Sequence, residues 1–257
     1  MEGMDGNIEL IVKGRGSSIS CDFDEPLNIP IELYSAQIGL KGFSTFNNIP
    51  NVVEGINNRL KIKVPGQDYK LFSLDTGAYE LKVIAAQIQE WIEVTYPKLE
   101  KVDENFKLIG NNATSKAEFL FKDDYGIDFD VSNGMGSMLG FEDVKIEGIG
   151  RYVGKYIVSI TSVTQLIFNC NITTSNFING KEMPFIYSCA VNVPAGYRMY
   201  RELTDIAYKN LTTTQISHIR IWVVDEYGTP VELRDDTLTV ILSLRLSRRV
   251  TPVSVQG

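Results

Sequence analysis

The sequence predicts an all-β protein, built as an antiparallel β-sandwich with one amphipathic helix inserted between strands. Roughly a third of the 257 residues are Val, Ile, Thr, Tyr, Phe or Trp, which favour strands, and only nine are Ala, the strongest helix former. Short apolar runs recur between turn signals along the whole chain, and only one stretch has clear helical periodicity. No repeat of about 20 to 50 residues is visible, which argues against propellers and solenoids.

Strands are predicted wherever a short apolar run is bounded by turn residues. The alternation of apolar and polar residues is cleanest late in the sequence, where Ile219, Ile221 and Val223 share one face. Gly228 and Pro230 then supply a turn before the last strand. The predicted strands are residues 8–12, 31–43, 60–64, 69–74, 106–109, 117–121, 127–131, 156–161, 165–173, 185–193, 198–207, 216–225 and 238–248.

The one predicted helix covers residues 79–96, where apolar side chains recur at spacings of three and four residues. Pro97 ends it, and we expect it to pack on an outer face or a sheet edge of the sandwich. Residues 134–141 predict a short turn or helix whose Leu139 and Phe141 close one end of the sandwich. The candidates for the N-terminal cap of the long helix are Asp75, Thr76 and Gly77.

The absence of a low-complexity linker predicts a single domain over residues 1–257. Residues 1–28 are expected to form an N-terminal arm, and residues 249–257 a C-terminal tail. No apolar run approaches 18 residues, so no membrane insertion is expected. The net charge of −7 disfavours nucleic-acid binding as the main role. Any contact with nucleic acid should be peripheral, through Arg245, Arg248 and Arg249.

The single histidine, His218, argues against most hydrolytic and zinc-dependent enzymes, because multi-histidine sites are unavailable. Its place in a strand pattern favours a histidine on a strand face or at an interface over a general base. No catalytic residues are therefore predicted. No cofactor is predicted either.

Three cysteines, Cys21, Cys170 and Cys189, cannot all pair and have no CxxC spacing. We expect buried, reduced thiols, with a bridge between Cys170 and Cys189 as the alternative.

A cluster of acidic residues is a candidate calcium-binding site. The EF-hand pattern starting at Asp128 fails, because Asn133 stands where the turn glycine belongs and Leu139 where the bidentate glutamate belongs. The alternatives that remain are a polar hairpin tip and a calcium site in a loop of the sandwich. The candidate ligands of that site are Asp123, Asp124 and Asp128.

Several segments together resemble the penton proteins, the minor capsid proteins of Polinton-like viruses, adintoviruses and virophages. The opening strand and bend of that family are similar to IELY at 31–34 and IGLKGFSTFNNIPNV at 38–52. The other similar segments are TGAYEL at 76–81, SMLGF at 137–141, IRIWVVDEYG at 219–228 and LTVILSLR at 238–245.

The resemblance implies a single jelly-roll sandwich, five copies of which close a capsid vertex beside the major capsid protein. It implies a structural protein of the virion, assembled inside the infected cell, with no enzymatic activity. The chain length favours the vertex protein over the longer major capsid protein, and no large insertion for a receptor-binding projection is evident. A carbohydrate-binding or glycan-cleaving β-sandwich remains the alternative from another class, and a cement or fibre-base protein is a third option.

A five-fold ring needs two different contact surfaces on each subunit, because one flank of each copy meets another flank of the next. Loops and edge strands are the parts of a sandwich that are free to supply them. We expect the bend at 43–53 and the connection at 193–200 to contribute, unless their apolar side chains close the core of their own subunit. The candidate contact residues are Phe43, Phe46, Ile49, Val52, Tyr197 and Tyr200.

Overall fold

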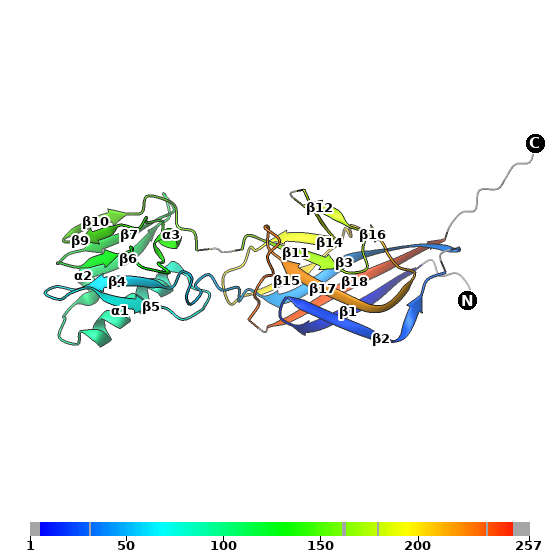
Figure 1. The fold of residues 1–257 in the computed structure, drawn as a ribbon, viewed down its shortest axis with the longest axis horizontal. Helices are drawn as coiled ribbons and strands as arrows, with labels where there is room; N and C mark the ends of the chain where they lie inside the picture. Colours follow the sequence, from blue (N-terminus) through cyan, green and yellow to red (C-terminus); the bar gives the residue numbers. More distant parts are fainter. Residues whose placement is uncertain (1–5, 31, 161–162, 179, 235, 249–257) are drawn as a thin grey trace, which may run out of the picture. The chain divides into compact units, whose positions relative to one another are not determined.

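The structure is a computed structural model that describes residues 6–30, 32–160, 163–178, 180–234 and 236–248. These residues fall into two compact units (Figure 1). One, the sandwich, contains the described parts of residues 1–48 and 163–257; the other, the insertion, contains those of residues 49–162. The prediction of one domain without a large insertion therefore missed a second unit, which interrupts the sandwich after Asn48.

The sandwich consists of a five-stranded and a four-stranded antiparallel sheet. The first has the order β1-β18-β3-β15, with β16 also paired to β3, and the second has the order β14-β11-β17-β2. Eight strands in these two orders form a jelly roll, as the sequence predicted. The bounds are β1 Gly6–Arg15, β2 Ser18–Asn28, β3 Tyr34–Phe46, β11 Gln165–Cys170, β14 Phe185–Ala190, β15 Arg198–Glu202, β16 Lys209–Asn210, β17 Gln215–Val224 and β18 Thr237–Arg248, and a small hairpin adds β12 Asn176–Ile178 and β13 Lys181–Met183.

The alternation along each strand places its apolar side chains between the two sheets. In β18, five side chains from Leu238 to Leu246 are buried at every second position. Phe43 on β3 meets Phe168 on β11 across the core, with ring centroids 4.6 Å apart. These contacts join the two sheets through apolar burial.

The first strands correct the prediction of an N-terminal arm over residues 1–28. β1 pairs with β18 along its whole length, and β2 pairs with β17, so each is an integral edge strand of its sheet. Gly16 forms the turn between them at a φ of 76°. The predicted tail at 249–257, and with it Arg249, lies outside the described residues.

The insertion has two sheets of its own, with the orders β5-β4-β8-β9 and β10-β7-β6. The predicted strand at 156–161 is absent, since residues 156–160 form no strand. The elements of the insertion are β4 Arg59–Lys63, β5 Lys70–Ser73, α1 Leu81–Thr95, α2 Val102–Asn105, β6 Phe106–Asn111, β7 Lys116–Phe121, β8 Gly126–Asp128, α3 Gly136–Leu139, β9 Lys145–Glu147 and β10 Gly150–Val153.

Aromatic rings fill the core of the insertion. Phe119 on β7 is fully buried, and its ring lies 5.5 to 6.0 Å from those of four other phenylalanines. Those four are Phe106, Phe121, Phe129 and Phe141. This cluster belongs to one continuous core that extends from Val52 to Ile146. The insertion therefore has a hydrophobic core separate in sequence from that of the sandwich.

The long helix forms where the periodicity predicted it, but in a different setting. α1 buries Ile84, Ala85, Ile88 and Ile92 in the core of the insertion, so it does not cover the sandwich as expected. Its N-cap is Glu80, which makes no side-chain capping bond, so the three predicted cap residues do not fill this role.

The predicted short helix also forms, as α3, but in the insertion. Leu139 and Phe141 are buried in the core of the insertion and do not close the sandwich. The predicted positions of both helices were wrong for the same reason, because no sequence signal marks residues 49–162 as a separate unit.

Candidate subunit interface

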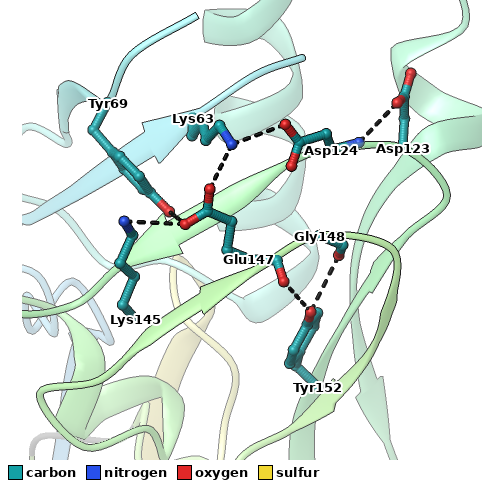
Figure 2. Close-up of polar contacts among 8 residues, drawn as sticks. All are labelled: Lys63, Tyr69, Asp123, Asp124, Lys145, Glu147, Gly148 and Tyr152. Atoms are coloured by element: carbon teal, nitrogen blue, oxygen red, sulfur yellow. Dashed lines mark hydrogen bonds and ion pairs between the residues drawn. The ribbon is translucent and has the colours of Figure 1, made fainter. Parts of the chain in front are cut away.

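The acidic residues considered for calcium are bonded to other groups of the insertion (Figure 2). The Asp124 carboxylate lies 2.8 Å from Lys63 Nζ, and that of Asp128 lies 3.4 Å from Lys61 Nζ. Asp123 accepts a hydrogen bond from the backbone N–H of Asp124. Among the described residues no group of three or more His, Cys, Asp or Glu is arranged to hold a metal ion. The three carboxylates thus support a polar hairpin tip, the alternative interpretation.

Lys63 is the centre of an ion-pair network on the sheet of β4, β8 and β9 (Figure 2). Besides Asp124 it pairs with Glu147, which also lies 3.0 Å from Lys145 Nζ and accepts a hydrogen bond from the Tyr69 hydroxyl. The hydrogen bond from Lys63, followed by that from Lys145, lowers the pKa of Glu147 to about 2. The hydrogen bond to Asp124 raises the pKa of Lys63 in turn. The network ties neighbouring strands together, and its carboxylates are neutralised by lysines.

This network makes the stability of the insertion dependent on pH. An unfolded glutamate has a pKa of about 4.3, so Glu147 binds its proton less tightly in the folded state. Its contribution is complete above about pH 5 and is lost as the pH falls from about 4.3 towards 2. We expect thermal unfolding followed by circular dichroism to show this loss, and Lys63→Gln to flatten the dependence between pH 2 and 5. Lys98→Gln, which removes an exposed lysine of the insertion, is the control, and an equal slope in both variants would contradict the assignment.

His218 lies on β17, opposite Asp22 of β2, and its Nδ1 is 2.7 Å from the Asp22 carboxylate. It is therefore a histidine on a strand face, as the sequence favoured.

The cysteine thiols are too far apart along the strands to pair. Leu166 of β11 stands opposite Cys189, and Cys170 lies four residues further along the same strand. That offset corresponds to about 13 Å, well beyond the Cα separation of a disulfide. Burial raises the pKa of both thiols to about 11. The register thus supports reduced thiols at Cys170 and Cys189 over the alternative bridge, whereas Cys21 is only half-buried, so the expectation of buried thiols was wrong for this residue.

The six predicted contact residues separate into two groups. Phe43, Ile49 and Val52 are buried, which agrees with the alternative that they close their own core. Phe46, Tyr197 and Tyr200 are 42%, 63% and 59% exposed.

The structure brings these three exposed residues together at one edge of the sandwich. β15 pairs with β3 so that Arg198 stands opposite Phe46 and Tyr200 opposite Ser44. The backbone N–H of Asn47 donates to the carbonyl of Tyr197, and its side chain donates to the carbonyl of Val193. These bonds fix the 193–197 connection against the end of β3. We name Phe46, Tyr197, Arg198 and Tyr200 the aromatic edge.

A groove of about 490 Å³ lies beside the aromatic edge. Its wall comes mainly from β15, with Ala190 at the end of β14, the connection that follows it and Phe43 of β3; β14 and β15 are the outermost strands of the two sheets on this side. Sequence reasoning missed Arg198, Arg201 and Asn192 in this wall. Only the strand order could have revealed them, because it shows that β14 and β15 are both edge strands. The lining includes Phe43, Ala190, Asn192, Arg201 and Glu202.

The architecture can be compared with known proteins. No protein-family model and no curated protein matches the sequence. Among solved structures, the crystal structure of the mavirus penton protein matches with a TM-score of 0.51 and 11% sequence identity. The match covers 94% of this chain and 100% of the mavirus chain. The fold is penton-like.

The penton-like fold includes more than the jelly roll. The sandwich is little more than half of the sequence, so a match over 94% of the chain must extend into the insertion. Among the described helices, none has the length and apolar character needed to cross a membrane.

Proposed function

We propose that this chain is the vertex subunit of a viral capsid, which assembles into homopentamers and contacts neighbouring major capsid proteins in the virion. The observation that carries the proposal is the penton-like fold, which the chain shares over both units with the mavirus penton protein. In this role the protein is structural and has no catalytic site.

The aromatic edge supports this role. Aromatic side chains grouped on the solvent-facing side of an antiparallel sheet are typical of protein contact surfaces. Tyrosine and arginine are also enriched among the residues that dominate binding energy at interfaces. The edge carries both residue types beside a groove. Electron microscopy and native mass spectrometry of the purified protein test the proposal, with five-fold rings as the expected result and monomers at every concentration as the contrary one.

Replacing Phe46 and Tyr197 together by alanine should abolish rings without unfolding the subunit. Both side chains are largely exposed, so we expect the free energy of unfolding to change by less than about 1 kcal/mol. As contact residues they should weaken subunit association by about 30-fold or more. Sedimentation velocity measures the association, and thermal unfolding measures the stability.

The control for this variant is Phe177→Ala. Phe177 lies on the β12–β13 hairpin, outside the proposed surface, and its side chain is 72% exposed. A double variant that keeps its rings but unfolds at a lower temperature would assign Phe46 and Tyr197 to the core of their own subunit.

One observation favours the alternative of a glycan-binding module. The groove beside the aromatic edge contains Tyr200, Glu202 and Asn192, an exposed aromatic with a carboxylate and an amide nearby. The Tyr200 hydroxyl donates to the Glu202 carboxylate at 3.0 Å. Screening the protein on a glycan array tests this function. Saturable glycan binding that Tyr200→Ala abolishes would support the alternative.

Of the C-terminal arginines considered for nucleic acid, Arg245 is held by contacts within its own subunit. The Arg245 guanidinium stacks on Tyr208, 3.9 Å from the ring centroid, and donates to the Gln37 side chain. Arg248 ends β18 opposite Tyr34. We propose that any contact with nucleic acid is peripheral.

A further inference from the structure

The two long edges of the sandwich differ in charge and shape. β15, at one edge, carries Arg198 and Arg201 on opposite faces, and among the described residues no carboxylate pairs with either. Arg198 donates to Ser44 Oγ at 2.8 Å, and its guanidinium lies over the ring of Tyr200. Arg201 is half-buried. Burial, the larger effect, raises the pKa of Tyr187, whereas Arg201 lowers it. β15 therefore carries two arginines against one carboxylate, Glu202, which accepts a hydrogen bond from Tyr200, and the edge contains the groove of about 490 Å³.

The opposite edge is formed by β1 and β2, and most of the acidic residues on it belong to β2. The pairing of β2 with β17 is interrupted between Asp22, opposite His218, and Leu27, opposite Ile216. Residues 23–26 of β2 therefore face the single residue Ser217 and form a bulge. Within this bulge, Asp24 and Glu25 are exposed and have no cationic partner among the described residues. We name residues 23–26 the acidic bulge.

We propose that in the assembled ring the acidic bulge of one copy docks on the groove and arginines of the β14–β15 edge of the next copy. The inference rests on the proposed function, because it names the two surfaces that join neighbouring subunits. The occupant of the groove is a second copy of this chain. The argument is charge complementarity between two unpaired arginines and two unpaired carboxylates on opposite edges of one sandwich.

The same charges disfavour the wrong associations. Two β14–β15 edges brought together would oppose arginine to arginine, and two acidic bulges would oppose carboxylate to carboxylate. Like charges in contact cost several kcal/mol, so a symmetric dimer through either edge is disfavoured. The head-to-tail contact, which a ring requires, brings the two arginines to the two carboxylates of the acidic bulge.

Protection against unwanted strand pairing explains the features of the β2 edge, but it does not explain the exposed aromatic side chain of the β15 edge. Charges, a bulge and Pro26 on β2 are devices that stop an edge strand from pairing with other strands. β15 has no proline, lysine or bulge and presents Tyr200 to solvent. The three charged residues of this short strand also discourage strand pairing, but its exposed Tyr200 beside a groove is better explained as a surface that a neighbour covers.

Charge reversal of the two edges tests the inference. We expect Arg198→Glu, and separately the double change Asp24→Arg and Glu25→Arg, each to weaken pentamer formation about 30-fold or more in sedimentation experiments. A chain that carries all three changes should recover part of the association, because the carboxylate at position 198 again meets opposite charges on the bulge, whereas Arg201 does not. An equimolar mixture of the groove-reversed and bulge-reversed proteins should form mixed dimers and open chains, although each protein alone associates weakly. A ring of five cannot alternate two kinds of subunit, so the mixture should not close into pentamers.

The matched controls are Lys181→Glu and Glu182→Arg, exposed residues of β13 outside both edges. Each makes the same kind of charge change and should leave the pentamer unchanged. Circular dichroism should show that every variant is folded. Wild-type pentamers that tolerate both reversals, or a combined variant that recovers nothing, would overturn the inference and leave the proposed function standing. A wild-type protein that is monomeric at every concentration would overturn both.

Discussion

Replacing Phe119 by alanine should lower the unfolding temperature of the insertion and leave that of the sandwich unchanged. The side chain is fully buried and packs against four other phenylalanine rings. Its removal leaves a cavity in a core that includes no residue of the sandwich. We expect a loss of about 3–5 kcal/mol in the free energy of unfolding of the insertion. Differential scanning calorimetry should resolve this as one shifted transition beside an unshifted one.

The matched variant is Phe168→Ala, which makes the same change in the sandwich. Phe168 is also fully buried and contacts Phe43 and Tyr187. It should shift the other transition by a similar amount, because each unit has its own core. A single transition that moves equally in both variants would contradict the independence of the two units.

The second large effect is expected at Gly140, which follows α3 at a φ of 79°. A Cβ at this position would lie 2.3 Å from the carbonyl oxygen of Tyr156, closer than any real contact. Gly140→Ala therefore adds a backbone clash to the cost of placing alanine in the left-handed region. Together these should destabilise the insertion by about 2–5 kcal/mol, as measured by chemical denaturation.

Gly148→Ala separates the two contributions. Gly148 has a similar φ of 89°, but a Cβ added there would have no atom within 4 Å beyond its chain neighbours. Only the conformational cost of about 1–2 kcal/mol applies there. Equal losses in the two variants would show that the close approach of Tyr156 contributes nothing.

Much of the secondary structure could be predicted because local periodicity determines it. The last two strands and α1 follow directly from alternation and from helical spacing. β2 was missed because its sequence, SISCDFDEPLN, combines acidic residues and proline in a strand that is mostly exposed. The strands of the insertion have the same β-rich composition as those of the sandwich. No change in composition therefore marks the boundaries near residues 48 and 163.

The candidate sites depended on contacts that are distant in sequence. Asp124 and Asp128 resemble metal ligands until β4 is placed beside β8, which brings Lys61 and Lys63 to them from about 60 residues away. Whether a predicted contact residue is buried or exposed is determined by the face of the strand on which it lies. Phe43 and Phe46 are three positions apart on β3, so they face opposite sides of the sheet, one buried and one exposed.

The position of β18 has a consequence for the order of folding. This strand lies between β1 and β3, so its sheet cannot be completed until residues 237–248 have been synthesised. The insertion is continuous in sequence and can bury its aromatic core much earlier on the ribosome. Until then β1 and β3 lack the strand that pairs with both of them. Their pairing with β18 then has to close a very long loop of chain. The sandwich should therefore be the slow step in the biogenesis of this chain, and the one that most depends on chaperones.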